Sequence, residues 1–258
     1  MKMKATETFI PYARQSLSEE DISAVVKVLR SDLLTQGPAI VEFESSVAGY
    51  CGAKYAVAVN SATSALHIAC LSIGLGPGDM LWTSPNTFVA SANCGLYCGA
   101  SVDFVDIDPL TGNMSVDKLG KKLEEAEKKG RLPKVVVPVH FAGQSCEMEL
   151  IALLAGRYGF KIIEDASHAI GGSYQRKKIG ASAFSDMTVF SFHPVKIIKT
   201  GEGGMVVTNR KELYERLALL RSHGITRAPE LMKGESHGPW YYQQVALGFN
   251  YRITDMQA

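Results

Sequence analysis

Short apolar segments alternate with longer helical patterns along most of this chain, and this alternation limits the fold more than any other feature. The apolar runs have the length of strands, and the segments between them place apolar residues at helical spacing. Such an alternation is typical of a largely parallel sheet with helices on both faces. We therefore predict an α/β fold of three layers.

The predicted elements cover most of the chain. A first helix opens at Ser18, where capping-box residues precede an apolar pattern of helical spacing. The further helices are expected at 39–50, 61–73, 89–98, 116–128, 148–158 and 211–222. The strands are expected at 55–59, 80–83, 102–105, 135–139, 161–163, 188–190 and 205–208.

Composition indicates an ordinary globular protein. The chain has 258 residues, enough for one large or two small domains, and is 46% hydrophobic and 21% charged. A net charge of +1 gives no global field for nucleic acid or an anionic membrane. No apolar run reaches the ~18 residues of a membrane span, and the charged start of the chain lacks the apolar region of a signal peptide.

The cysteines indicate a reducing compartment. Their number is odd, and Cys94 and Cys98 lie four positions apart on a predicted helix without a second Cys/His pair nearby. We therefore predict reduced thiols, mostly in the core of a cytoplasmic protein. The full set is Cys51, Cys70, Cys94, Cys98 and Cys146.

The end of the chain resembles a helix start. Thr254 or Asp255 would be its cap, and the sequence stops within the first turn. Because a helix of one turn cannot stand by itself, we expect a truncated chain that lacks a C-terminal part.

Two charged side chains are predicted where strands of this sheet end. Asp165 follows the strand at 161–163, and Lys196 follows 192–195, which is unusually apolar for a surface loop. Ligands of open α/β sheets bind at such strand ends. Pyridoxal phosphate (PLP) needs an amine to form a Schiff base and an anion beside its pyridine nitrogen. We therefore predict a PLP enzyme of the aminotransferase type. Lys199 competes with Lys196 for the role of the Schiff-base lysine. The simplest alternative is that both lysines are surface residues.

Other residues are candidates for contacts with the same cofactor. The segment 60–64 joins a strand to a helix N-terminus, where backbone N–H groups suit a phosphate, although Ser61 can simply be an N-cap. Ser191 could add a hydroxyl, and Phe88 could stack on the ring, although a lone aromatic is more often core. His168 could touch the ring or be a structural histidine. Its spacing from Asp165 also suggests a metal pair, but no third ligand is apparent, so we predict no metal site.

Taken together, these motifs resemble the DegT-type, sugar-nucleotide-dependent PLP aminotransferases of fold type I. The resemblance extends from Leu34 to the last residue, with its anchors in the family's order. It implies a PLP-binding large domain over 1–258, with an N-terminal helical segment, and a small C-terminal domain that is apparently absent. The anchors are Asn60-Ser61-Ala62-Thr63-Ser64-Ala65-Leu66, Thr87-Phe88-Val89-Ala90-Ser91-Ala92-Asn93, Glu164-Asp165-Ala166-Ser167-His168-Ala169, Ser191-Phe192-His193-Pro194-Val195-Lys196, Gly201-Glu202-Gly203-Gly204 and Gly248-Phe249-Asn250-Tyr251-Arg252.

The resemblance implies the catalytic roles. Lys196 is in the position of the Schiff-base lysine, so Lys199 is demoted. Asp165 is in the position of the pyridine-nitrogen partner, and His168 in that of the residue near the ring oxygen. Some relatives carry a histidine at the lysine position and perform dehydration, and Lys196 argues against that branch.

The resemblance also implies the remaining cofactor contacts. Ala62 and Thr63 are in the positions of the phosphate-binding turn, Ser191 in that of a further phosphate contact, and Phe88 in that of the stacking aromatic. Asn250 is in the position of the residue that reaches the phosphate of the neighbouring subunit. A homodimer with shared active sites is therefore expected.

The residues around Asp165 and the segment 221–225 most resemble one branch of this family. That branch aminates C4 of a UDP-linked 4-keto-6-deoxy-N-acetylhexosamine in pseudaminic acid biosynthesis, and L-glutamate is the expected amino donor. Another nucleotide-linked keto sugar, such as a pentose 4-ketone or a GDP-linked sugar, is the alternative substrate. A non-catalytic PLP-binding regulator and an inert fragment that only folds and dimerises are the alternatives from other classes.

Overall fold

The computed structural model describes residues 10–258, except 12, 235 and 236, and is built around a central sheet. The strands of this sheet are β1 (Tyr55–Val59), β2 (Met80–Thr83), β3 (Ser101–Phe104), β4 (Val135–Val137), β5 (Lys161–Asp165), β8 (Met187–Ser191) and β9 (Gly204–Thr208). They are arranged in the order β1-β9-β8-β5-β4-β2-β3. β9 is antiparallel to both of its neighbours, and the other adjacent pairs are parallel.

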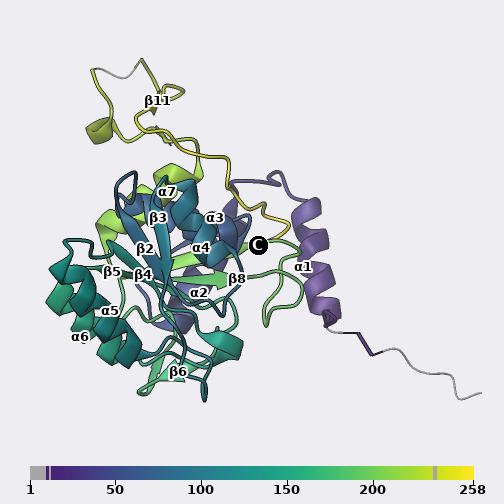
Figure 1. Ribbon diagram of the computed structural model, residues 1–258. Coiled ribbons are helices and arrows are strands. Elements are labelled where there is room, and N and C mark those ends of the chain that lie inside the picture. Colours follow the sequence, from purple (N-terminus) through teal and green to yellow (C-terminus); the bar gives the residue numbers. More distant parts are fainter. Residues whose placement is uncertain (1–9, 12, 235–236) are drawn as a thin grey trace, which may run out of the picture.

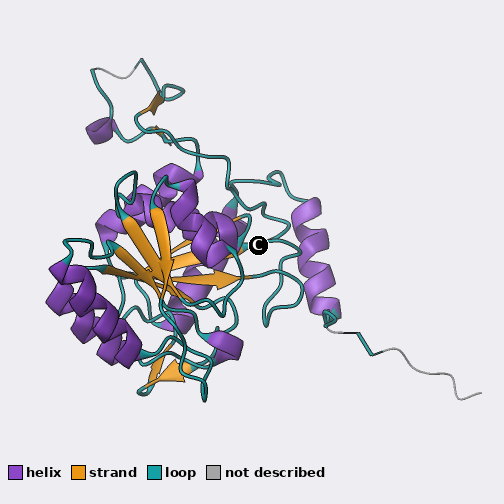
Figure 2. Ribbon diagram, viewed as in Figure 1, coloured by secondary structure: helices purple, strands orange, loops and turns teal. Residues whose placement is uncertain are grey.

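Helices lie on both sides of this sheet (Figures 1 and 2). They are α1 (Glu19–Leu29), α2 (Pro38–Cys51), α3 (Ala62–Ser72), α4 (Ala90–Tyr97), α5 (Val116–Lys128), α6 (Met148–Tyr158) and α7 (Lys211–Arg221). None of the helices in the described ranges is both long and apolar enough to cross a membrane. The predicted three-layer α/β fold is confirmed.

The shorter elements lie outside the main sheet. β6 (Ser173–Tyr174) and β7 (Lys177–Lys178) form one hairpin, and β10 (Ile225–Thr226) pairs with β11 (Gln243–Gln244). The segment that carries β11 extends away from the sheet at the top of Figure 1. Two short 3₁₀ helices are η1 (Phe141–Gly143) and η2 (Pro229–Leu231).

Successive strand residues enter different layers of the core. In β1, Val57 packs in the cluster that contains residues of α3, α4 and α7, whereas Ala56 and Ala58 pack in the cluster that contains residues of α2. In β2, Trp82 packs with residues of α5 and α6. This period of two buries both faces, which explains why the strands read as continuous apolar runs.

Two of the strand ends that differ from the prediction lie beside Asp165. β4 ends at Val137 rather than at 139, because Pro138 has no N–H for the ladder. β5 continues to Asp165 rather than ending at 163, and the Asp165 amide donates to the Pro138 carbonyl at 2.9 Å. Asp165 is therefore the last residue of its strand and not a loop residue.

The two predicted cap candidates near the end of the chain have different roles. Thr254 caps its own short turn, since its Oγ1 accepts from the Gln257 amide at 3.2 Å. The Asp255 carboxylate is only 2% exposed and caps α2 instead, accepting from the amides of Gly37 at 2.8 Å and Ala39 at 3.0 Å. Gly37 is the N-cap of α2 and has no side chain, so a distant residue supplies the acceptor.

All five cysteines are buried and none is in a disulfide, which agrees with the prediction that they lie in the core. Three of them, Cys70, Cys94 and Cys98, lie in the cluster under α3 and α4.

Candidate active site

Several strand ends meet at one edge of the sheet. Gly204, the first residue of β9, pairs with Ser191 at the end of β8 and with Val59 at the end of β1. β5 is parallel to β8, so Asp165 also lies at this edge. The topology therefore brings together the predicted phosphate turn after β1, Ser191 and Asp165.

The Asp165 carboxylate is held by hydroxyl groups. It is 5% exposed, and its Oδ2 accepts from Ser91 Oγ at 2.5 Å. Its Oδ1 accepts from Ser167 Oγ at 2.6 Å and from the Ser167 amide at 3.2 Å. Ser91 lies in the first turn of α4 and is itself hydrogen-bonded to Thr87 Oγ1 at 2.7 Å. Because an ionised carboxylate has about four acceptor sites, Asp165 can accept from a further donor.

Lys196 lies in a closed loop next to Asp165. The loop is held by the Phe192 amide, which donates to the Gly203 carbonyl at 2.9 Å, and by the Lys196 amide, which donates to the His193 carbonyl at 2.8 Å. Burial lowers the pKa of the Lys196 ammonium, and the nearby Asp165 charge opposes this shift. The lysine is therefore biased toward the neutral amine that nucleophilic chemistry requires.

His168 is the third titratable group of this site. Burial lowers the pKa of its imidazole, the Lys196 charge adds to this effect, and the Asp165 charge opposes it. The structure thus brings Lys196, Asp165 and His168 close enough to influence one another. Titratable groups with shifted pKa values at a strand edge, as Lys196 and His168 have, are typical of a functional site.

The competing lysine lies on the other side of the loop. Lys199 lines a groove of about 1130 Å³ between α1, α2 and the end of the described chain. Lys196, by contrast, lies where the Asp165 charge acts on its pKa. The position favours Lys196 as the functional amine.

The start of α3 forms a cradle of the kind that binds anions. Ser61 is the N-cap, and its Oγ accepts from the Ser64 amide at 3.1 Å. The amides of Ala62 and Thr63 precede the first intrahelical bond, so they point outward at the positive end of the helix. A Cβ on Gly204 would lie 2.5 Å from the Ala62 nitrogen, so only glycine fits where β9 approaches this turn. Such a site fits a phosphate group.

Phe88 and Asn250 lie at the margin of this arrangement. Phe88 precedes α4, and its side chain is 75% exposed. Asn250 is exposed and forms an isolated antiparallel bridge with Ser222. The next residue, Tyr251, accepts from the Asn60 amide at 2.8 Å, so this segment runs beside the phosphate turn. The roles of Phe88 and Asn250 stay predictions.

Glu164 belongs to a buried network that sequence reasoning missed. Its Oε2 lies 2.7 Å from His140 Nε2, and its Oε1 accepts from Ser185 and from Thr188 Oγ1, the latter at 2.9 Å. The Cys146 amide donates to His140 Nδ1 at 3.1 Å, so the proton of the ring lies on the nitrogen that faces Glu164. Burial raises the pKa of the Glu164 carboxyl, but these hydrogen bonds outweigh it and lower the pKa below its usual value.

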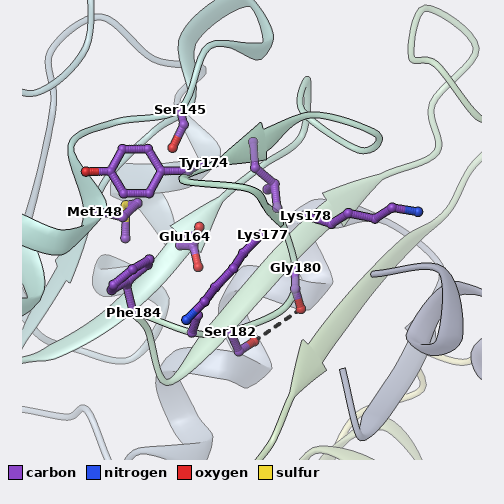
Figure 3. Close-up of a pocket in the computed structure, with 11 residues that line it drawn as sticks. Ser145, Met148, Glu164, Tyr174, Lys177, Lys178, Gly180, Ser182 and Phe184 are labelled. Atoms are coloured by element: carbon purple, nitrogen blue, oxygen red, sulfur yellow. Dashed lines mark hydrogen bonds between the residues drawn. The ribbon is translucent and has the colours of Figure 1, made fainter. Parts of the chain in front are cut away.

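Glu164 also lines a small cavity beneath the β6–β7 hairpin. Figure 3 shows its carboxylate among Met148, Tyr174, Lys177 and Phe184. The cavity has a volume of about 20 Å³, far below that of a cofactor pocket of about 300 Å³ or more. The opposite face, with Asp165 and Lys196, is therefore the candidate site. Within the described part of the chain, no group of three or more His, Cys, Asp or Glu side chains could hold a metal ion.

The sequence of this chain was compared with models of known protein families, and one family matches. The family model of the DegT/DnrJ/EryC1/StrS aminotransferases matches residues 15–258. A UDP-4-amino-4,6-dideoxy-N-acetyl-beta-L-altrosamine transaminase from Campylobacter jejuni subsp. jejuni serotype O:23/36 is 42% identical over 247 residues, which are 96% of this chain and 61% of that protein.

Solved structures give the same result. Helicobacter pylori PseC, an aminotransferase involved in the biosynthesis of pseudoaminic acid, matches with a TM-score of 0.85 and 36% identity, over 96% of this chain and 62% of its own. Spr1654 from Streptococcus pneumoniae, in its PLP form, matches with a TM-score of 0.82 and 28% identity, over 96% of this chain and 64% of its own. The chain spans less than two thirds of the length of these relatives. By its sequence and its fold, the chain belongs to the DegT/DnrJ/EryC1/StrS aminotransferase family.

Proposed function

We propose that this protein transfers an amino group from an amino acid to the keto carbon of a nucleotide-linked sugar, with PLP as cofactor and residues 1–258 as its cofactor-binding domain. The observation that carries the proposal is the convergence of Lys196, Asp165 and His168 at one sheet edge, beside the helix N-terminus of α3. Membership of an aminotransferase family and the likeness to Spr1654 in its PLP form support the choice of cofactor.

The residues present fit PLP. The amides of Ala62 and Thr63, with the Ser191 hydroxyl, would hold the phosphate in the cradle that Gly204 keeps open. Asp165 would hold the pyridine nitrogen, which is a donor when protonated. Phe88 would stack on the ring, and His168 would lie near its oxygen. When bound, PLP supplies an aldehyde for an amine and a ring that accepts the electron pair released at the substrate carbon.

The chain's own groups then have distinct tasks. Lys196 would bind the aldehyde through its neutral amine, whose population is raised by partial burial. As a free amine, Lys196 Nζ would take the proton from the α-carbon of the amino acid and later return a proton, as general base and then acid. Asp165, held in one orientation by Ser91 and Ser167, would hold the ring nitrogen with its carboxylate.

The finer proposal concerns substrates and assembly. We infer that L-glutamate is the donor and that the acceptor is a UDP-linked 4-keto-6-deoxy-N-acetylhexosamine of pseudaminic acid biosynthesis. The names of the Campylobacter jejuni and Helicobacter pylori relatives support this acceptor. The proposal includes a homodimer in which Asn250 reaches the phosphate site of the partner.

Covalent trapping tests the cofactor and the lysine together. The purified chain is mixed with PLP, reduced with borohydride and digested, and the modified lysine is located by mass spectrometry. We expect the pyridoxyl group on Lys196, and Lys196→Ala should abolish both the trapping and the turnover. Lys199→Ala is the matched control and should retain both.

The outcomes separate the alternatives. Trapping on Lys199, or near-normal turnover by Lys196→Ala, would overturn the assignment. Trapping on Lys196 without conversion of the cofactor by L-glutamate would favour a non-catalytic PLP-binding protein. Turnover with a GDP-linked keto sugar, but not with a UDP-linked one, would replace the finer substrate proposal and leave the coarser one standing.

A further inference from the structure

The segment 249–251 connects the end of α7 with the start of α3. The Phe249 amide donates to the Leu220 carbonyl at 2.8 Å, and the Tyr251 amide donates to the Arg221 carbonyl at 3.0 Å. Both carbonyls belong to the last turn of α7, so the segment is tied to this helix. Its other contacts are with α3, whose N-terminus forms the candidate phosphate cradle.

Tyr251 contacts the region of α3 at two separate points. Its carbonyl accepts from the Asn60 amide at 2.8 Å, just before the helix begins. Its hydroxyl is hydrogen-bonded to Nδ1 of His67, in the second turn of the helix, at 3.1 Å. Along the chain, the amides of Ala62 and Thr63 lie between these two points. The tyrosine therefore spans the stretch that carries the phosphate cradle.

Asn60 transmits the first of these contacts to the whole turn. Its Oδ1 accepts from Ser64 Oγ at 2.7 Å, and the same hydroxyl lies 3.0 Å from Ser61 Oγ. The Ser64 amide also donates to Ser61 Oγ at 3.1 Å. These hydrogen bonds join the two ends of the turn 60–64. A shift of Asn60 would therefore change the positions of the amides between them.

Aromatic packing fixes the second contact. The Tyr251 ring stacks on the Phe249 ring, with centroids 4.8 Å apart and planes inclined by 15°. The imidazole of His67 packs against both, with its centroid 4.9 Å from that of Phe249 and 5.9 Å from that of Tyr251. His67 is only 6% exposed, and a buried polar side chain needs a hydrogen-bond partner. The Tyr251 hydroxyl supplies that partner.

We propose that His67 and Tyr251 are positioning residues that keep the amides of Ala62 and Thr63 in the arrangement that binds a phosphate. The inference rests on the proposed function, in which these amides hold the cofactor phosphate. Tyr251 acts through the Asn60 amide at one end of the cradle and through His67 at the other. The pair should therefore affect affinity for the phosphate group and leave the binding of the aldehyde unchanged.

Two ligands that differ only in the phosphate test this role. Pyridoxal has the ring and the aldehyde of PLP but a hydroxyl group in place of the phosphate ester. The dissociation constants of both are measured on the purified chain from the visible absorbance of the Schiff base. In the wild type, PLP should bind roughly 100-fold more tightly than pyridoxal. Tyr251→Phe removes one hydroxyl and should weaken PLP binding by about tenfold, with a change of less than about twofold for pyridoxal.

A second variant and a control sharpen the comparison. His67→Phe removes the nitrogen on the other side of the hydrogen bond and should cause the same selective loss for PLP. Because both changes break one bond, the double variant should bind PLP no more weakly than either single variant. Tyr214→Phe is the matched control, since Tyr214 packs against the core cluster that contains α3 residues and lies on α7. It should retain the wild-type affinity for both ligands.

A merely structural role would give a different pattern. Equal weakening of PLP and pyridoxal in the folded variants, or wild-type affinity for both, would overturn the positioning role. Circular dichroism reports folding: if one variant is unfolded the other decides, and unfolding of both would overturn the proposal, because the pair would then be structural. A wild-type chain that binds neither ligand, or that does not prefer PLP to pyridoxal, would instead contradict the proposed function, and the positioning role with it.

Discussion

Glu164 and Asp165 are consecutive carboxylates on one strand, and they have opposite environments. Both are 5% exposed, and the alternation of β5 directs them to opposite faces of the sheet. Glu164 is surrounded by donors, with His140, Ser185 and Thr188 at its oxygens. Among the residues that the structure describes, Asp165 accepts from Ser91 and Ser167.

These different environments indicate that Glu164 has a structural role and Asp165 a functional one. Each carboxylate takes part in three hydrogen bonds, so the number of partners does not separate them. Their neighbours do: Glu164 is bound to a buried histidine, whereas Asp165 lies near a lysine whose pKa it influences and can bind a cationic group of a ligand. Burial alone does not distinguish the two residues, but the identity of their donors does.

The largest expected effect is on amino transfer in Asp165→Asn. This change keeps the size of the side chain and removes the charge, so the glutamate half-reaction should slow by about 100-fold or more. Single-turnover absorbance of the PLP-loaded protein measures the rate. Glu164→Gln is the control and should retain the wild-type rate at a temperature where it is folded. Near-wild-type turnover in Asp165→Asn would contradict the functional half of the comparison.

Stability should respond in the reverse way. Glu164→Gln places an amide donor against donors of Ser185, Thr188 or His140, so the free energy of unfolding should fall by about 3 kcal/mol. Asp165→Asn should change it by less than about 1 kcal/mol. Urea denaturation followed by circular dichroism gives both values. Equal losses of unfolding free energy in Glu164→Gln and Asp165→Asn would show that both carboxylates have the same structural role.

The acid sensitivity of folding should depend on Glu164. Its folded-state pKa is lowered, so its contribution to stability is present above the unfolded-state pKa of about 4.3 and is lost as the pH falls through the folded-state value. The stability difference between the wild type and Glu164→Gln should therefore shrink as the pH falls from 7 to below 4. Urea midpoints across this range measure it. A difference that is constant with pH would exclude the carboxylate charge as its source.

The smallest effects come from single hydroxyls. Ser91→Ala removes one donor from Asp165 and should slow amino transfer by about tenfold with little change in stability. Ser185→Ala removes one donor from Glu164 and should lower the free energy of unfolding by about 1 kcal/mol without changing the transfer rate. Both variants can be tested with the same two assays. A loss of stability in Ser91→Ala together with a loss of transfer rate in Ser185→Ala would reverse the roles assigned to Asp165 and Glu164.

The fold could be predicted from local sequence wherever the signal is periodic. The helices at Val116–Lys128 and Met148–Tyr158 follow the predicted bounds, and Ser115 caps the first of them. The ends of strands were harder to predict, because the pairing with neighbouring strands, rather than the local composition, decides where a strand ends. The structure therefore extends β5 to Asp165 and ends β4 before Pro138.

The candidate site was predictable only in part. Asp165 and Lys196 could be proposed from the sequence because the apolar strands before them are easy to recognise there. Their supporting residues could not, because Ser91 is 74 positions from Asp165 and His140 is 24 positions from Glu164. Thr87, which is hydrogen-bonded to Ser91, lies before α4, so no helical spacing marked the serine in the sequence.

The Asp255 cap of α2 has a consequence for synthesis of the chain. Its carboxylate binds the Gly37 amide across a separation of 218 residues. At about 5–20 residues per second, a ribosome takes roughly 10 to 40 seconds to make that stretch. During this time the start of α2 lacks its acceptor, and β1 waits for β9, its antiparallel partner at Tyr55↔Thr208. The emerging chain therefore has an exposed helix end and an open strand edge while this stretch is made, when a holding chaperone would be most useful.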